Sequence, residues 1–186
     1  MIIIGVDPGT LITGYGIIES RNGTVRAIAY DAIKNNSSKS MPLRLQNIFE
    51  SLCDVIERFH PDEFAIETAF YGKNAQSALK LGHARGVAML AAVIQEIPVG
   101  EYSPREVKKA IVGKGTASKE QVQYMVKSIL CIREKIMVVD SSDALAVALC
   151  HSYCTQNVFT NLHSRIKNNS WKYFIEENPG RIVKIK

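Results

Sequence analysis

Residues 2–10 read IIIGVDPGT, an apolar run that ends in an aspartate and a turn. Residues 2–6 are all apolar or glycine, which predicts a buried strand. Asp7 stands where that strand gives way to Pro8-Gly9, a pair typical of turns. A carboxylate is costly to bury unless a positive charge compensates it. Asp7 is therefore a candidate site residue at the end of a central strand.

Three further acids lie at the borders of apolar segments. Glu67 ends the run 64–66, and Asp140 and Asp143 open the apolar helical stretch 144–149. Residues three apart share one face of a helix, so we expect Asp140 and Asp143 to point the same way. Taken singly, Asp140 reads as a helix N-cap and Glu67 as an exposed strand end. Four acids in three distant places instead favour convergence on a hard cation.

Such a convergence has a definite chemistry. Carboxylates within a few ångströms of one another repel, which raises their pKa values and destabilises the empty site. Two divalent ions ~3.5–4 Å apart would remove this cost, activate a water and stabilise the leaving oxygen of a phosphoryl displacement. Oxygen ligands without histidine or cysteine suit magnesium. We therefore expect two Mg²⁺ ions, which Mn²⁺ can replace, held by the catalytic residues Asp7, Glu67, Asp140 and Asp143.

The periodicity of the chain predicts an α/β fold with a five-stranded mixed sheet flanked by helices. Three strands, at 2–6, 15–19 and 25–33, form an antiparallel meander with a turn at Arg21-Asn22-Gly23. The later elements are a helix at 45–59, a strand at 63–67, a helix at 74–96, a strand at 97–102, and helices that begin near 103, 118 and 140. Capping boxes at Ser103 and Ser118 mark two of these helix starts. We expect one domain over residues 1–155 and a basic C-terminal tail over 156–186.

Positive charge is concentrated in two places. The chain of 186 residues carries a net charge of +5, with six Lys or Arg against two Glu in residues 156–186 and five against one in residues 103–119. Segregated positive charge beside a carboxylate cluster favours a polyanionic substrate. A solvated helix face followed by a disordered basic tail is the simpler alternative.

Composition excludes several classes of protein. A hydrophobic share of 46% and a charged share of 22% are those of a soluble globular chain. No apolar run approaches the roughly 20 residues that span a bilayer, and the N-terminus lacks the pattern of a secretory signal. The four cysteines contain no C-x-x-C pair. We expect buried free thiols in a reducing cytoplasm and no membrane association.

The sequence resembles the RuvC family of Holliday-junction endonucleases, which have an RNase H-like fold. The resemblance covers roughly residues 1–155 and is carried by IIIGVDPG at 2–9, AIETAF at 65–70, KNAQSALKLGHARG at 73–86, KKAIVGKG at 108–115 and DSSDALAVA at 140–148. It implies a homodimer that nicks two strands of a four-way DNA junction symmetrically and leaves 5′-phosphate and 3′-hydroxyl ends. It also implies that Asp7 bridges two metals, and that RuvA and RuvB are partners. Some members of the family have histidine at the position of Asp140.

The residues that we expect to contact DNA fall in two groups. Phe70, Tyr71 and Lys73 follow Glu67 in a predicted loop, where an aromatic ring would stack on an unpaired base. Packing of Phe70 against the next helix is the alternative, and the resemblance favours Phe70 at the junction centre. The second group consists of Arg105, Lys108, Lys109, Lys114 and Lys119. Gly113-Lys114-Gly115 with the helix start at Ser118 would form a phosphate cradle, or merely a turn with exposed lysines.

Two questions stay open at this level. Ala78, Gly82 and Gly86 form a strip of small residues, which indicates close packing with a helix either of the same subunit or of a second copy. The function also has rivals: a ribonuclease of RNA–DNA hybrids, an actin-like ATPase, and a junction-binding protein that does not cut. The last is disfavoured because all four acids are present.

Overall fold

The computed structural model describes residues 1–68, 75–133 and 139–168, with side chains as far as residue 155. Its contacts divide the chain into a compact unit, Met1–Ser152, and a second unit, Tyr153–Lys186. The predicted DNA-contacting residues Phe70, Tyr71 and Lys73 lie outside the described residues. The fold below is that of the first unit.

A five-stranded mixed sheet forms the centre of this unit, in the order β3-β2-β1-β4-β5. The strands are β1 (Ile2–Asp7), β2 (Ile12–Arg21), β3 (Thr24–Lys34), β4 (Glu63–Glu67) and β5 (Val99–Tyr102). The first three form the predicted antiparallel meander, and β4 and β5 run parallel to β1. The β2–β3 turn has Asn22 and Gly23 at φ 51° and 78°, the left-handed conformations that a tight hairpin needs. The predicted position of the first strand at the centre of the sheet is confirmed.

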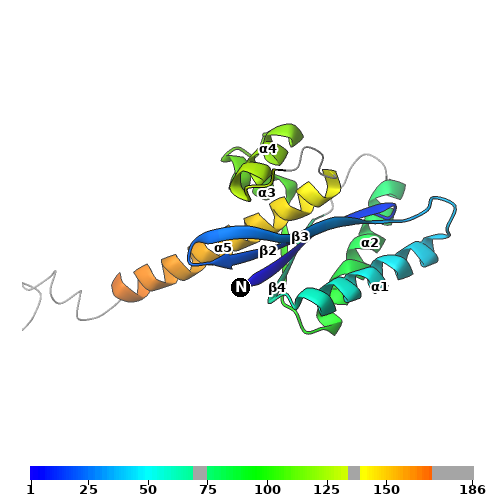
Figure 1. Ribbon diagram of the computed structural model, residues 1–186, viewed down its shortest axis with the longest axis horizontal. Coiled ribbons are helices and arrows are strands. Elements are labelled where there is room, and N and C mark those ends of the chain that lie inside the picture. The colour runs from blue at the N-terminus through cyan, green and yellow to red at the C-terminus, as the bar shows by residue number, and fades with distance from the viewer. Residues whose placement is uncertain (69–74, 134–138, 169–186) are drawn as a thin grey trace, which may run out of the picture. The chain divides into compact units, whose positions relative to one another are not determined.

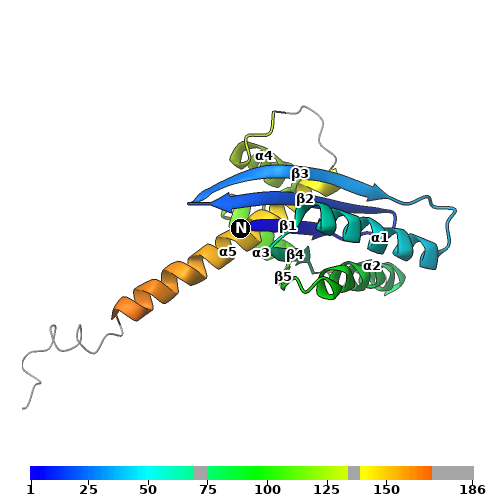
Figure 2. The same ribbon diagram turned by 60° about the horizontal axis from the view of Figure 1, so that its bottom comes forward.

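One face of the sheet is built for two helices, α1 (Met41–Phe59) and α2 (Ala75–Ile94). Large side chains on this face, among them Ile4, Val6, Phe64 and Ile66, form the core with Ile48, Leu52 and Ile56 of α1 and with four alanines of α2. All four of those strand residues are fully buried. Figures 1 and 2 show both helices along this side of the sheet.

The opposite face is built for close approach of the long helix α5 (Val139–Asn168). A row of small residues, Gly16, Gly5, Ala65 and Gly100, lies in register across β2, β1, β4 and β5. A Cβ added to Gly5 would lie 2.1 Å from the carbonyl oxygen of Ala144 in α5. Because only glycine leaves this space, the main chain of α5 can lie directly on the sheet.

Two shorter helices stand beside α5. They are α3 (Pro104–Val112) and α4 (Lys119–Ile129), near the start of α5 in Figure 1. Both begin with the predicted capping boxes, Ser103 with Glu106 and Ser118 with Gln121. Gly113 ends α3 at φ 80°. Of the two interpretations of Gly113-Lys114-Gly115, the inter-helix turn therefore explains the first glycine, because Gly113 is the left-handed residue that ends α3.

The outer side of α2 has no covering partner among the residues that the structure describes. Leu79, Leu90, Val93 and Ile94 are exposed, and a Cβ on Gly82 or Gly86 would have no neighbour within 4 Å. The predicted alternative of a helix crossing within the subunit is therefore not found in the described part. By length and composition α2 is also apolar enough to cross a membrane, but its alanine face packs in the core, and such a test is weak.

One expectation needs correction. The thiols are not generally buried: Cys150 is buried, Cys53 is half-buried, and Cys131 and Cys154 are exposed. Cys131 follows the last turn of α4 at φ 54°. The helix α5 continues to Asn168, so residues 156–168 of the predicted basic tail are helical, and the division at residue 155 stays a prediction.

Candidate active site

The two acids at strand ends lie at one edge of the sheet. Asp7 ends β1 and Glu67 ends β4, and the two strands are parallel neighbours with Val6 opposite Ile66. Parallel strands end at the same edge, and the alternation of side chains turns both carboxyls to the α5 face, as it does Gly5. The sheet therefore brings together two carboxyls that are far apart in the sequence.

The first turn of α5 meets the same edge. Gly14, the partner of Asp7 in the β1–β2 register, has no side chain, and a Cβ there would lie 2.1 Å from the carbonyl oxygen of Asp140. Asp143 lines a cleft together with Glu67. The charge of Asp140 acts on both Asp7 and Asp143. The structure thus brings the four predicted acids together from three elements.

These carboxyls carry an uncompensated electrostatic cost. Burial, followed by the charges of Glu67 and Asp143, raises the pKa of Asp7 from 3.8 to about 8. Burial and then the Asp143 charge raise the pKa of Glu67, although a hydrogen bond between the Asp7 and Glu67 carboxyls opposes this. Burial also raises the pKa of Asp143. Because its hydrogen bond with Asp7 lowers the pKa of Glu67 while the Glu67 charge raises that of Asp7, the shared proton is held on Asp7.

Lys119 supplies part of the missing positive charge. Its Nζ lies 2.5 Å from Oδ2 of Asp143, with 57% of the lysine side chain exposed. Burial alone would lower the pKa of Lys119, but the hydrogen bond and charge of Asp143 and the charges of Asp7 and Asp140 raise it above its ordinary value. An ion pair this exposed contributes little to stability. Its consequence is local, since it holds a cation against the carboxylate cluster.

A cleft of about 170 Å³ opens over this cluster. It is lined by two acids from β4 and α5, by two lysines from α3 and α4, and by apolar side chains. The lining residues are Glu67, Pro104, Val107, Lys108, Lys119, Val122, Asp143 and Ala146. Lys108 also lowers the pKa values of Glu67 and Asp143 against the raising effect of burial. Carboxylates beside lysines in one cleft suit a phosphate diester that approaches a metal-binding centre.

The donor set fits divalent metal, but the side chains are not already arranged as ligands. Within the described residues, no group of three His, Cys, Asp or Glu side chains is placed to hold a metal ion. The ion pair from Lys119 engages Asp143, and the Asp7–Glu67 hydrogen bond engages two more carboxyls. Metal cations that bind here would take the place of the proton shared by Asp7 and Glu67 and of the Lys119 ammonium beside Asp143.

The predicted basic residues separate into two groups in the structure. Lys108 and Lys119 line the cleft. Arg105, Lys109 and Lys114 are exposed outside it, and Arg105 packs over Gly115, where a Cβ would lie 2.7 Å from its Cγ. Sequence reasoning gave Lys119 a phosphate contact and missed its ion pair with Asp143. The capping box at Ser118 fixes where α4 begins, but no local pattern indicates that its first residue faces α5.

Comparison with known proteins identifies relatives over most of the chain. The family described as Crossover junction endodeoxyribonuclease RuvC matches residues 3–151. A RuvC of Salinibacter ruber is 44% identical over 98% of this chain and 99% of its own length. One from Geobacter metallireducens is 52% identical over 82% of this chain and 92% of its own length.

Solved structures agree with the sequence relatives. A Thermus thermophilus RuvC in complex with a Holliday junction substrate has a TM-score of 0.79 and 32% identity, over 83% of this chain and 94% of that chain. The yeast mitochondrial Holliday junction resolvase has a TM-score of 0.60 at 12% identity, over 88% of this chain and 85% of that chain, which shows a shared fold alone. The predicted RNase H-like fold is confirmed. With a family match over residues 3–151, this chain belongs to the RuvC family of crossover junction endodeoxyribonucleases.

Proposed function

We propose that this protein is a metal-dependent endonuclease that resolves four-way DNA junctions in recombination and repair. The observation that carries the proposal is a cleft lined by Glu67, Asp143 and two lysines, with the buried Asp7 close enough to feel the charges of both acids. Membership of the RuvC family, and a relative solved with a Holliday junction, support the substrate. The ends left by hydrolysis would be a 5′-phosphate and a 3′-hydroxyl, which a ligase can join.

The ligands we assign to two Mg²⁺ ions, or to Mn²⁺ in their place, are Asp7, Glu67, Asp140 and Asp143. When bound, the ions supply an activated water and neutralise charge on the scissile phosphate. Asp7 feels the charges of all three other acids, which supports it as the ligand shared by both ions. Its proton would leave when metal enters, because a ligating carboxylate must be ionised.

Lys119 and Lys108 have complementary tasks in this mechanism. Lys119 would release Asp143 when metal arrives, and its ammonium would then face the incoming phosphate from the cleft wall. Lys108 would contact a neighbouring phosphate oxygen. The exposed Arg105, Lys109 and Lys114 would hold the backbone of an arm of the junction. Contacts of this kind position DNA without reading its sequence.

We assign a stacking role at the junction centre to Phe70 and Tyr71, with Lys73 on an adjacent phosphate. This part of the proposal rests on the sequence, in which two aromatic residues directly follow the segment that ends in Thr68-Ala69. A base freed from pairing can stack on an aromatic ring regardless of its identity. The two residues therefore suit recognition of a distorted junction.

A homodimer would supply two such sites for two symmetric nicks. The support is the apolar outer side of α2, on which Leu79, Gly82, Gly86, Leu90 and Val93 recur at spacings of three and four. Because α2 also buries alanines in its own core, it is apolar on both sides, as expected for a helix with a second partner. We assign this surface, the α2 seam, to a second copy of the chain. We also propose RuvA and RuvB as further partners and a cytoplasmic location, which the resemblance to the family implies.

The experiment that tests the function compares substrates and metal. The protein is incubated with an end-labelled four-way junction, a matched duplex and an RNA–DNA hybrid, each with Mg²⁺ and with EDTA. Paired symmetric nicks on the junction, lost in EDTA, are the expected result. Cutting of the hybrid instead would make the protein a ribonuclease, and binding without cuts would make it a scaffold.

The same assay tests the ligand assignment. Asp7→Asn should abolish cleavage and retain junction binding in EDTA, because it removes a charge that metal needs and little volume. Asp54→Asn, an exposed carboxyl of α1 on the other side of the sheet, is the matched control and should cut normally. Cleavage by Asp7→Asn at the parent rate would overturn the assignment.

A further inference from the structure

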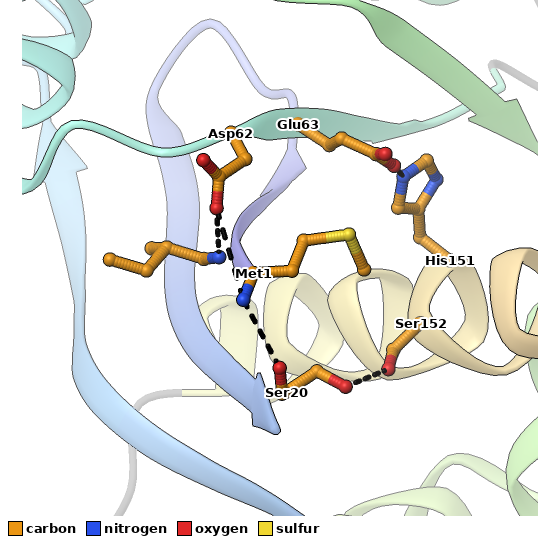
Figure 3. Close-up of polar contacts among 7 residues, drawn as sticks. Met1, Ser20, Asp62, Glu63, His151 and Ser152 are labelled. Atoms are coloured by element: carbon orange, nitrogen blue, oxygen red, sulfur yellow. Dashed lines mark hydrogen bonds and ion pairs between the residues drawn. The ribbon is translucent and has the colours of Figure 1, made fainter. Parts of the chain in front are cut away.

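A second polar cluster lies under α5, away from the carboxylates. His151, only 6% exposed, contacts two strands at once (Figure 3 shows its pairing with Glu63). Its Nε2 pairs with Oε2 of Glu63 in β4, and its Nδ1 lies 2.8 Å from the hydroxyl of Tyr102 in β5. The mechanism above uses none of these three side chains.

The donors and acceptors of this cluster match. The Glu63 carboxylate only accepts, so Nε2 of His151 carries the hydrogen that it donates. In the neutral ring Nδ1 then accepts from the Tyr102 hydroxyl. The two rings meet edge to face, with centroids 5.5 Å apart at 82°. A buried ring with both nitrogens bonded is held in one orientation.

The sheet is shaped to admit this histidine. Gly100 stands in register with Ala65, and a Cβ there would lie 2.6 Å from Nδ1 of His151. The next residue of α5, Ser152, donates from its hydroxyl to that of Ser20 in β2, 3.1 Å away (Figure 3). One turn of α5 therefore makes hydrogen bonds to strands on either side of β1: to β2 on one side, and to β4 and β5 on the other.

The strands bonded in this way are also the strands that carry the active site. The strand β4 begins at Glu63 and ends at Glu67. Tyr102 of β5 lies opposite Glu67 in the register of the two strands. Ser103 and Pro104 follow directly and begin α3, whose Lys108 lines the cleft. On the helix side, His151 lies eight residues after Asp143, which is about 12 Å along α5. A slide or rotation of α5 at His151 would shift Asp143 against Glu67.

We propose that His151, with Glu63 and Tyr102, is a positioning residue for the metal-binding carboxylates: it fixes α5 on β4 and β5 and so sets the separation of Asp143 from Glu67. The proposal rests on the function proposed above and deepens it. Glycine contacts set how near α5 lies to the sheet, but a smooth glycine row does not stop the helix from sliding. Directional hydrogen bonds to two strands do.

The test uses the full-length protein and three substitutions in the cluster. Tyr102→Phe removes one hydroxyl, His151→Phe keeps a ring and removes both hydrogen bonds, and Glu63→Gln keeps an acceptor for Nε2. Leu149→Ala is the control, a truncation of a fully buried α5 side chain outside the cluster. Each variant is measured for single-turnover junction cleavage against Mg²⁺ concentration, for junction affinity in EDTA, and for the rise in melting temperature that Mg²⁺ causes.

Tyr102→Phe and His151→Phe should cut about tenfold or more slowly, because a misplacement of about 1 Å is enough for such a loss. They should also need more Mg²⁺ for half-maximal rate and show a smaller Mg²⁺-induced rise in melting temperature. Junction affinity in EDTA should stay near that of the parent. Glu63→Gln should retain most of the rate, and Leu149→Ala should lose stability but keep the Mg²⁺ dependence of the parent.

If the cluster variants lose stability but keep the parent Mg²⁺ dependence, as Leu149→Ala should, His151 is only structural and the proposal is wrong. If His151→Phe does not fold, Tyr102→Phe, which changes a single atom group, decides the question by the same readouts. A parent protein that binds Mg²⁺ but does not cut junctions would refute the proposed function. The Mg²⁺-induced change in melting temperature would still test the positioning role.

Discussion

Asp7 is the side chain on which the charges of the site converge. Its carboxyl titrates near 3.8 in the unfolded chain and at about 8 in the folded chain without metal, because it is buried beside Glu67 and Asp143. A raised pKa means that the folded state holds the proton more tightly. The resulting stabilisation is complete below pH 3.8 and is lost as the pH rises through about 8.

Asp7→Asn should therefore be more stable than the parent in EDTA at pH 8.5, and the difference should vanish towards pH 4. One pKa unit corresponds to about 1.4 kcal/mol. Since 1 kcal/mol moves the melting temperature of a chain this size by roughly 2–4 °C, a rise of several degrees is expected. Thermal unfolding by circular dichroism across this pH range measures it, and saturating Mg²⁺ should reverse the order. An Asp7→Asn curve parallel to that of the parent at every pH would contradict the raised pKa.

At this scale the sequence identified the acids because carboxylates at the borders of apolar runs are rare and visible. It did not find the side chains that balance these acids or those that hold their elements in place. Lys119 is one basic residue among five in its segment, and its contact with Asp143 depends on how α4 packs beside α5. His151 stands in an apolar helix, where the sequence gives no indication of its partners Glu63 and Tyr102.

The helix α5 is the element that completes the site, and its approach depends on glycines of the sheet. A Cβ on Gly16 would lie 2.6 Å from Cγ of Leu145, a side chain, whereas one on Gly14 would lie 2.1 Å from the carbonyl oxygen of Asp140. The first clash is mainly with a side chain that mutation can shorten, although the main-chain nitrogen of Leu145 also lies 3.0 Å away. The second is with main chain and cannot be relieved in this way.

We expect Gly16→Ala to destabilise the protein by about 1–3 kcal/mol through overpacking, and Leu145→Ala by about 2–5 kcal/mol through a cavity. The double variant should be more stable than the sum of the two losses implies, because each change relieves the other. Gly14→Ala should lose cleavage in addition to stability, since it displaces Asp140. Urea denaturation of the four variants measures the coupling, and strict additivity of Gly16→Ala and Leu145→Ala would show that α5 does not lie on Gly16.

Elements with local signals were predictable and those with tertiary causes were not. The capping boxes at Ser103 and Ser118 predicted where α3 and α4 begin, and Asn22-Gly23 predicted the β2–β3 turn. These predictions succeeded because each sequence motif and the structure it forms involve the same few residues. By contrast, β2 begins at Ile12, before the predicted strand, because residues 12–14 pair with residues 32–34 of β3, and no local pattern in the sequence marks that pairing. The glycine row under α5 became visible only once the strand register was known.

The whole molecule has a different surface on each side of its sheet, and this division explains its layout. Large aliphatic residues of the strands pack against α1 and α2, while glycines on the other face bring the main chain of α5 to the strands that carry the acids. The α5 face also buries large side chains, among them Ile3, Leu145 and Leu149, so it contributes to stability as well as positioning the acids. The α2 seam is a further apolar surface, and the sequence left its partner open between the same subunit and a second copy.

The α2 seam should hold two copies of the chain together. Leu90→Glu places a charge on it and should shift the protein to monomers in sedimentation equilibrium. Leu43→Glu is the matched control, because Leu43 of α1 is 52% exposed and Leu90 is 50% exposed, but only Leu90 belongs to the seam. On a junction held in supercoiled plasmid, the Leu90→Glu protein should release singly nicked circles where the parent gives linear product, since two linked sites cut within one binding event and a single site does not. Equal dimer dissociation constants for Leu90→Glu and Leu43→Glu would place the dimer contact elsewhere on the molecule.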